Sequence, residues 1–404
     1  MQSYTKAPSD EGAVTGRHSR PVTEGETPSH PSSEPIGLYL HIPFCRSKCV
    51  YCDFCSFPRP DEALMSAYVD ELIRRMERAP ARDREVDTVY FGGGTPSLLP
   101  PHLVRKLTEA IHANFRILPD AEITVECNPT GEIDWTPWVA GGINRVSMGV
   151  QSMQDVELHR LGRRHRAADV SRTVADVRRA GIRNVNLDVM LGIPEQTAAS
   201  LEDTLEKMLA LEPTHLSAYC LTVEDGTPLD RLLAEGRIAI PDEEQTLALY
   251  EQVCRTLASH GWEHYEISNF ARDGFRSRHN THTWQYREYL GLGVAAHSFL
   301  DGERFGNSRD MDAFLRGEDI VIERNRPTGD EMISEYVMLA LRLSDGLCEQ
   351  DFLLRFGKSI NHALDAPLDP FIQQGLMTHK NGRIALTEQG FSVSNAILSD
   401  ILPL

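Results

Sequence analysis

Four of the chain's eight cysteines lie within eleven consecutive positions, in the stretch HIPFCRSKCVYCDFC (residues 41–55). Cys45, Cys49 and Cys52 have the spacing C-x3-C-x2-C, and Cys55 follows three positions later. Thiols this close together could serve a disulfide staple, a zinc site or an iron–sulfur cluster. The rest of the sequence has to decide among these three.

Composition and spacing disfavour disulfides and zinc. Eight cysteines in 404 residues is a low density, and residues 1–35, which read as a disordered tail, contain no apolar run typical of a secretory signal. We therefore expect a cytoplasmic protein with reduced thiols. Structural zinc sites usually pair two C-x-x-C motifs across a longer spacer, whereas iron–sulfur cubanes accept closely spaced cysteines.

The number of thiolate ligands determines what a cluster can do. A cubane held by three thiolates leaves one iron open to an exogenous ligand, whereas one held by four is closed and carries electrons. Cys55 could be a fourth ligand, a resolving thiol or a small buried hydrophobic residue, and we favour the last. The remaining cysteines are dispersed and are expected to be structural.

The spacing C-x3-C-x2-C, with Tyr51 before the last cysteine, resembles the radical S-adenosylmethionine (SAM) superfamily. The resemblance implies a [4Fe-4S] cluster on Cys45, Cys49 and Cys52, whose open iron is chelated by the amino and carboxylate groups of SAM. An electron passed into the sulfonium then cleaves a C–S bond and leaves a carbon radical. The protein's task is to hold SAM and exclude other hydrogen donors.

Strand-like runs alternating with helical periodicity must position these cysteines. The expected strands cover residues 38–42, 86–91, 122–127, 145–150, 184–192, 215–222 and 262–267. Such alternation predicts βαβ crossovers and a mainly parallel sheet. We expect an α/β fold, a partial (β/α)6 TIM-like barrel with one ligand site at the carboxyl edge of its strands.

Several polar or flexible residues lie near the ends of these strands, and the resemblance implies that they contact SAM. They are Tyr39, Tyr51, Gly93, Gly94, Thr95, Glu126, Gln151, Arg163 and Asp188, with Thr222 as a weaker candidate. The glycines of FGGGTPS would let the backbone approach the ligand closely, although structural turns use such runs too. Glu126 could instead be a surface charge. Asp188 interrupts an apolar strand, which is costly unless the carboxylate has a partner.

The C-terminal third has a different pattern. Residues 275–298 look irregular, residues 330–346 form an amphipathic helical pattern, and Asn381-Gly382 between two β-like runs predicts a hairpin. Helices followed by a hairpin and a last helix suggest a winged-helix-like module. We expect a tail (1–35), a radical SAM partial barrel (36–270), a linking segment (271–325) and a small helical, winged-helix-like domain (326–404).

The stretches LYLHIPFC, GGGTPS, ECNP, GVQS and YLGLG together resemble the oxygen-independent coproporphyrinogen III oxidase-like family. The decarboxylases of that family have a fourth cysteine two residues after the third, where this chain has Phe54. The intact YEISNFA (residues 265–271) and HNTHTW (residues 279–284) instead resemble the HemW-type heme chaperones, although Thr283 replaces a tyrosine of their motif.

The resemblance implies heme as a ligand. We expect His279 as the axial ligand and Trp284 beside it, with His282 and His297 as backups. The alternative is that His279 caps a turn and Trp284 fills a core. The leading function is heme binding and transfer to an acceptor hemoprotein, with a membrane respiratory enzyme as a candidate acceptor and a homodimer as a candidate state.

Two other functions remain open. The chain could be a coproporphyrinogen III dehydrogenase, which would decarboxylate its substrate in porphyrin biosynthesis, or an electron-transfer protein with Cys55 as a fourth ligand. Nucleic acid is a poor partner, because 59 acidic against 41 Lys and Arg residues give a net charge of −18. The basic stretch RLGRRHR (residues 160–166) is the local exception, and it could equally be a solvated helix end. No apolar run is long enough to span a bilayer.

Overall fold

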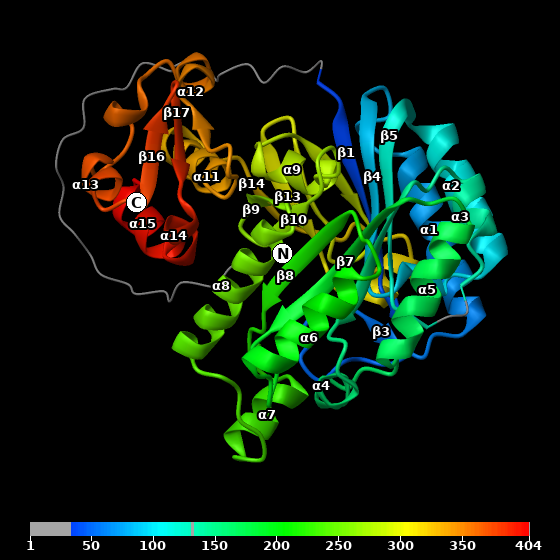
Figure 1. The fold of residues 1–404 in the computed structure, drawn as a ribbon. Helices are drawn as coiled ribbons and strands as arrows, with labels where there is room; N and C mark the ends of the chain where they lie inside the picture. Colours follow the sequence, from blue (N-terminus) through cyan, green and yellow to red (C-terminus); the bar gives the residue numbers. More distant parts are fainter. Residues whose placement is uncertain (1–33, 131–132, 404) are drawn as a thin grey trace.

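The computed structural model describes residues 34–130 and 133–403, and one mixed sheet forms its framework (Figure 1). Its strand order is β14-β13-β12-β11-β1-β4-β5-β6-β7-β8-β10-β9. The strands are β1 (Ile36–Ile42), β4 (Glu85–Gly93), β5 (Arg116–Cys127), β6 (Arg145–Gln151), β7 (Asn184–Leu191), β8 (His215–Cys220), β9 (Glu263–Glu266), β10 (Asn269–Ala271), β11 (Tyr289–Leu292), β12 (His297–Leu300), β13 (Glu303–Asn307) and β14 (Val321–Asn325). A two-stranded pair, β2 (Phe44–Cys45) and β3 (Phe57–Pro58), borders the cysteine loop.

Six neighbouring strands, β1 and β4 to β8, run parallel. This confirms the expected α/β fold with six parallel strands. The helices and 3-10 turns that connect or follow the strands are α1 (Glu62–Glu77), η1 (Pro96–Leu98), α2 (Pro101–Asn114), α3 (Thr136–Ala140), α4 (Asp155–Arg160), α5 (Ala167–Arg179), α6 (Ala198–Leu209), α7 (Pro228–Ala234), α8 (Glu243–Ser259), α9 (Arg278–Trp284) and α10 (Met311–Leu315).

Alternation along the parallel strands separates an apolar face from a polar one. In β6, Val146, Met148 and Val150 belong to the main hydrophobic core, while Arg145 and Ser147 lie on the opposite face. The apolar face packs under the helices that surround the sheet in Figure 1. The inner face of the sheet is therefore the polar one, which is where a ligand can be held.

Two expectations for the edges of the sheet were wrong. Residues 262–267 do not continue the parallel series, because β9 and β10 form a tight antiparallel hairpin beside β8. A connection of two residues allows a hairpin but no parallel crossover. Residues 275–298 are not irregular, because they form α9, β11 and the start of β12, and β11 pairs parallel with β1.

The C-terminal residues form a smaller helical module. Its elements are α11 (Gly329–Ala340), β15 (Leu347–Cys348), α12 (Glu349–Phe356), η2 (Ile360–His362), α13 (Asp369–Gln373), β16 (Met377–Lys380), β17 (Arg383–Leu386), α14 (Glu388–Ser392) and α15 (Ser394–Ile401). The predicted hairpin is confirmed, with φ of 55° at Asn381 and 70° at Gly382. The amphipathic helix is shorter than expected and ends at Ala340.

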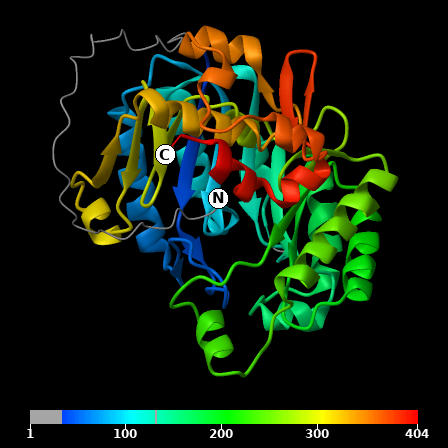
Figure 2. The ribbon, with the colours of Figure 1, turned by 90° about the vertical axis from the view of Figure 1, so that its left-hand side faces the viewer.

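This module packs against the strands that the linking segment contributes. Tyr286 and Phe299 share a hydrophobic core with residues of the module, including Tyr336 and Phe352. Figures 1 and 2 show the module on one side of the sheet. Among the described residues, no helix is both long and apolar enough to cross a membrane.

Candidate functional site

The cysteine loop follows β1 and lies at the carboxyl end of the parallel strands. Cys45, Cys49 and Cys52 are all half-buried. The Cys45 Sγ lies 3.6 Å from Thr95 Oγ1, and the Cys49 Sγ accepts a hydrogen bond from Arg163 at 3.6 Å. Burial raises the pKa of the Cys45 thiol and raises that of Cys52 to about 11. The Cys45 and Cys52 thiols are therefore protonated until a metal displaces their protons.

The donor set of this loop fits an iron–sulfur cluster. Three thiols lie on one short loop, two of them, Cys45 and Cys49, beside polar partners, and thiolates are the ligands of such clusters. Within residues 34–130 and 133–403, no three His, Cys, Asp or Glu side chains are already arranged to hold a metal ion. Cys55 differs from the other three, because it is 9% exposed and belongs to the main core. That placement agrees with its interpretation as a buried hydrophobic residue.

The glycine run at the end of β4 closes tightly over Glu126. The Glu126 carboxylate accepts hydrogen bonds from Tyr90 Oη at 2.9 Å and from the Gly93 backbone N–H at 3.0 Å. A Cβ atom at Gly92 would lie 2.9 Å from the rings of both Tyr39 and Tyr90. Gly93 has a φ of 108°, which favours glycine. Burial is the main cause that raises the pKa of Glu126 to about 7.

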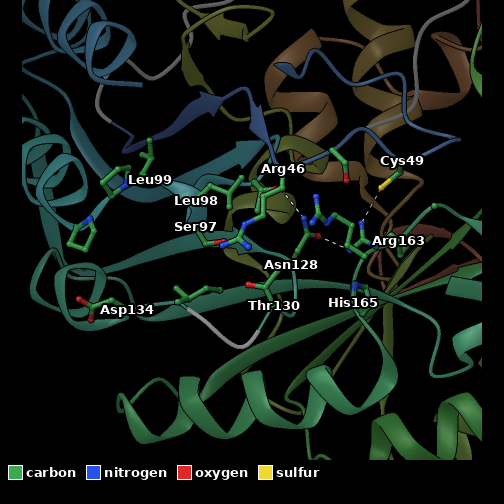
Figure 3. Close-up of a pocket in the computed structure, with 17 residues that line it drawn as sticks. Arg46, Cys49, Ser97, Leu98, Leu99, Asn128, Thr130, Asp134, Arg163 and His165 are labelled. Atoms are coloured by element: carbon green, nitrogen blue, oxygen red, sulfur yellow. Dashed lines mark hydrogen bonds between the residues drawn. The ribbon is translucent and has the colours of Figure 1, made fainter. Parts of the chain in front are cut away.

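A chain of hydrogen bonds connects the cysteine loop to β4, β5 and β6. Asn128 donates to Thr95 Oγ1 at 2.8 Å, and Arg163 donates to Asn128 Oδ1 at 2.6 Å and to the Gly149 carbonyl. Figure 3 shows Cys49, Asn128 and Arg163 converging beside a cavity of about 250 Å³. The sequence reasoning missed Asn128, although its motif ECNP was recognised.

The other SAM candidates approach the same edge from neighbouring elements. Asp188 on β7 accepts a hydrogen bond from Asn186 at 2.7 Å, and burial raises its pKa. Gln151 ends β6 with a φ of 69°, and its buried Oε1 has no partner among the described residues. Tyr51 packs beside Leu161 and Met190 in a small separate cluster. Thr222 is exposed just beyond the end of β8, so it is not part of this group of buried or half-buried SAM candidates.

The Tyr39 side chain connects this edge to the heme candidate His279. Its hydroxyl lies 3.0 Å from His41 Nδ1, and its ring centroid lies 6.5 Å from that of His279. The His279 ring also stacks on Tyr90 at 5.0 Å, and its Nδ1 lies 2.9 Å from Thr88 Oγ1. Burial is the main cause that lowers the pKa of His279 to about 3, so the imidazole is neutral, as metal ligation requires.

The structure places His279 inside the fold rather than on its surface. The side chain is 6% exposed, and Glu122 anchors the start of its helix by accepting hydrogen bonds from the Arg278 and His279 backbone N–H groups, both at 3.1 Å. With Nδ1 engaged, Nε2 is the nitrogen that remains for a metal. Heme ligation by His279 would therefore use the Nε2 of a side chain that the fold largely encloses.

The other heme candidates are not gathered around His279. His282 is buried and lies 3.1 Å from Asp87 Oδ2, and His297 is exposed on β12. Trp284 is half-buried against the C-terminal core, with the Arg342 guanidinium 5.6 Å from its ring centroid. Its indole N–H is buried without a partner among the described residues.

Comparison with known proteins shows the relationships of this chain. Residues 39–208 match the Radical SAM superfamily, and residues 328–393 match the HemN C-terminal domain. The "Heme chaperone HemW" of Escherichia coli (strain K12) is 34% identical over 373 residues, covering 90% of this chain and 97% of that protein. The protein of the same name from Bacillus subtilis (strain 168) is 32% identical over 377 residues, covering 90% and 98%.

A mitochondrial protein and a solved structure extend these relationships. The "Radical S-adenosyl methionine domain-containing protein 1, mitochondrial" of Mus musculus is 32% identical over 409 residues, covering 96% of this chain and 92% of that protein. The structure of coproporphyrinogen III oxidase (HemN) from Escherichia coli shares the fold, with a TM-score of 0.79, 24% identity and coverage of 91% and 90%. This chain belongs to the HemW family of the radical SAM superfamily.

Proposed function

We propose that this chain is a heme chaperone, which binds heme and transfers it to an acceptor hemoprotein. The observation that carries the proposal is the likeness to proteins named heme chaperones, at 32% and 34% identity over 90% of the chain. Heme as the ligand and a hemoprotein as the acceptor follow from those names. As finer parts of the proposal, the acceptor is a membrane respiratory enzyme, the chaperone is a homodimer and it acts in the cytoplasm.

The scaffold would hold a [4Fe-4S] cluster through Cys45, Cys49 and Cys52. When bound, such a cluster supplies an open iron for the amino and carboxylate groups of SAM and an electron for its sulfonium. Arg163 supports this assignment, because its hydrogen bond to Cys49 places a positive charge beside the thiolates. Glu126 and the glycine run would hold the polar end of SAM.

The alternative function is oxidative decarboxylation of coproporphyrinogen III. The shared fold with HemN is compatible with it, but Phe54 stands where the decarboxylases have a further cysteine, and its side chain is 57% exposed. We expect anaerobic incubation of the cluster-loaded protein with coproporphyrinogen III and SAM to yield no protoporphyrinogen. Formation of protoporphyrinogen would make the chain an enzyme of that pathway.

Hemin titration tests the chaperone function directly. We expect hemin to shift its Soret band on binding, and the loaded protein to pass heme to an apo-hemoprotein acceptor. His279→Ala should weaken binding if its Nε2 ligates the iron, whereas the exposed His112→Ala should not. An unchanged titration of His279→Ala would remove that residue from the heme site, and absence of any Soret shift in the wild type would reject the function.

A further inference from the structure

A buried arginine on the inner face of the sheet has no partner. Arg145 begins β6 and is 1% exposed. Its Nε is buried without a hydrogen bond, and no hydrogen bond or ion pair joins its guanidinium to any other described residue. Removing a guanidinium from water without a counter-ion costs several kcal/mol. We therefore expect a group that the described chain does not itself provide to compensate the charge of Arg145.

The residue opposite Arg145 on the neighbouring strand is also unpartnered. Thr124 on β5 pairs with Arg145 in the register of the sheet. Thr124 is fully buried, and its hydroxyl has no hydrogen-bond partner within the described structure. Both side chains lie on the inner face, because Ile123, Val125 and Val146 alternate with them and belong to the core under the helices. Two unused hydrogen-bond donors thus lie side by side.

The surrounding polar groups are satisfied without Arg145. Asn186 donates to Ser147 Oγ at 2.8 Å, and its own Oδ1 lies 2.7 Å from His215 Nδ1. The His215 Nε2 in turn lies 2.8 Å from the Tyr265 hydroxyl. Burial lowers the pKa of His215 and raises that of Asp188, and the charge of Arg145 lowers both. Asn186, His215 and Tyr265 are thus paired with one another and leave the donors of Arg145 and Thr124 free for an acceptor from outside the chain.

The site fits a carboxylate on an extended ligand. A guanidinium and a hydroxyl donate to a planar anion, and Arg matches the two oxygens of a carboxylate. Arg145 and Gln151 are six positions apart, so β6 spans about 20 Å between them. A ligand that enters at the carboxyl edge must therefore be long to reach Arg145. Tyr219, which is 37% exposed, and the partly exposed Asp188 show that the inner face is accessible near that edge.

We propose that Arg145 and Thr124 receive a propionate carboxylate of a tetrapyrrole held against the inner face of the sheet. This proposal rests on the chaperone function and adds to it the group of the ligand that is recognised. The ligand's propionate would supply the direct hydrogen-bonded counter-ion that no described residue provides to Arg145. Other carboxylates, such as that of SAM, share this chemistry, and the experiment separates the two sources.

The test compares hemin with hemin dimethyl ester, whose propionates carry no charge. Both are titrated into the full chain and into Arg145→Met, Thr124→Val and the exposed-residue control Arg183→Met. We expect Arg145→Met to weaken hemin binding by about 10- to 100-fold, with a smaller loss in Thr124→Val. Neither variant should change ester binding or the affinity of the cluster-loaded protein for SAM, and Arg183→Met should match the wild type.

Thermal unfolding without ligand provides a second readout. Since the guanidinium is buried and unpaired, Arg145→Met should melt at the same temperature as the wild type or higher. A lower melting temperature in Arg145→Met would instead assign Arg145 a structural role and overturn the proposal.

The binding outcomes separate this proposal from the function on which it rests. Equal hemin affinities in the wild type, Arg145→Met and Thr124→Val would overturn the propionate site and leave the chaperone function standing. Loss of SAM affinity in Arg145→Met with hemin binding unchanged would show that Arg145 binds the carboxylate of SAM. That result would also overturn the propionate site. Absence of hemin binding in the wild type would reject both.

Discussion

Arg163 is the side chain that joins the cysteine loop to the strands behind it. Its guanidinium reaches the Cys49 thiol, the Asn128 side chain and the Gly149 carbonyl, which lie in three separate segments of the chain. The planar guanidinium of an arginine can make these three contacts at once, whereas the ammonium of a lysine cannot. The geometry of the loop therefore depends on an arginine at this position.

Arg163→Lys should weaken SAM binding of the cluster-loaded protein by about tenfold, because lysine keeps the positive charge but lacks the planar guanidinium. Equilibrium binding of SAM measures the effect. Arg160→Lys, in the same basic stretch, is the matched control, because Arg160 pairs with Glu195 at the surface. Equal affinities in the two variants would contradict the role of Arg163.

The cysteines allow a similarly direct comparison. Replacing Cys45, Cys49 or Cys52 with alanine should abolish the cluster, measured as iron and sulfide content after anaerobic reconstitution. Cys55→Ala should retain it, because its thiol lies in the core and its nearest polar contact is the Arg309 carbonyl at 4.0 Å. Loss of iron in Cys55→Ala would make that residue a fourth ligand and support the electron-transfer alternative.

Motifs named candidate residues, but they did not predict the contacts between these residues. The cysteines, glycines, Glu126 and Arg163 could be named because the family resemblance carries them. Asn128 was missed because its amide acts only through the spatial neighbours Thr95 and Arg163. Arg145 carried a usable signal, since a charge inside an apolar strand is as costly as the one recognised at Asp188.

At the level of elements, the β9–β10 hairpin is the edge at which the sheet meets the C-terminal module. The Ile267 backbone N–H donates to the Arg342 carbonyl at 3.1 Å, and that of Ser344 donates to the Tyr265 carbonyl at 2.9 Å. Glu266 lies within this junction, is 1% exposed and has an unpartnered carboxylate oxygen. Burial is the main cause that raises its pKa from 4.5 to about 7.

The raised pKa of Glu266 predicts a pH dependence of stability. The folded protein favours the neutral carboxyl, so this contribution is fully present below pH 4.5 and is lost as the pH rises through about 7. Glu266→Gln should therefore be more stable than the wild type at pH 8, by up to about 3 kcal/mol, with little difference at pH 5. Urea unfolding at both pH values, with the exposed Glu206→Gln as the control, measures it, and a pH-independent difference would contradict the assignment.

Sequence patterns predicted the long elements and failed at the short ones. The strands β1 and β4 to β8 could be expected because apolar residues recur along them and helices separate most of them. β11 and β12 have four residues each, too few to show a clear period, and β11 also contains a glycine. The pairing of β11 with the distant β1 depends on the completed sheet rather than on local sequence.

For the whole molecule, the continuous sheet and the shared core at Tyr286 and Phe299 predict one cooperative unit. Phe352 on α12 is fully buried in that core, whereas Leu354 on the same helix is 77% exposed. Phe352→Ala should cost about 3–5 kcal/mol, and Leu354→Ala should stay within about 0.5 kcal/mol.

Because the two parts unfold together, Phe352→Ala should also lower the midpoint reported by Trp138, which lies in the other core. Denaturant unfolding followed by tryptophan fluorescence and by circular dichroism measures both midpoints. Separate transitions, with the fluorescence midpoint unmoved by Phe352→Ala, would show that the module unfolds independently.

The pairing of β1 with β11 has a consequence for biosynthesis. The strand that leads into the cysteine loop is made early, yet its second hydrogen-bonded neighbour, residues 289–292, is made about 250 residues later. Until then, one edge of that strand stays open to wrong pairing. A nascent chain that acquires iron and sulfide early would therefore do so before β11 has paired with β1. This topology favours assembly of the cluster after the complete chain has left the ribosome.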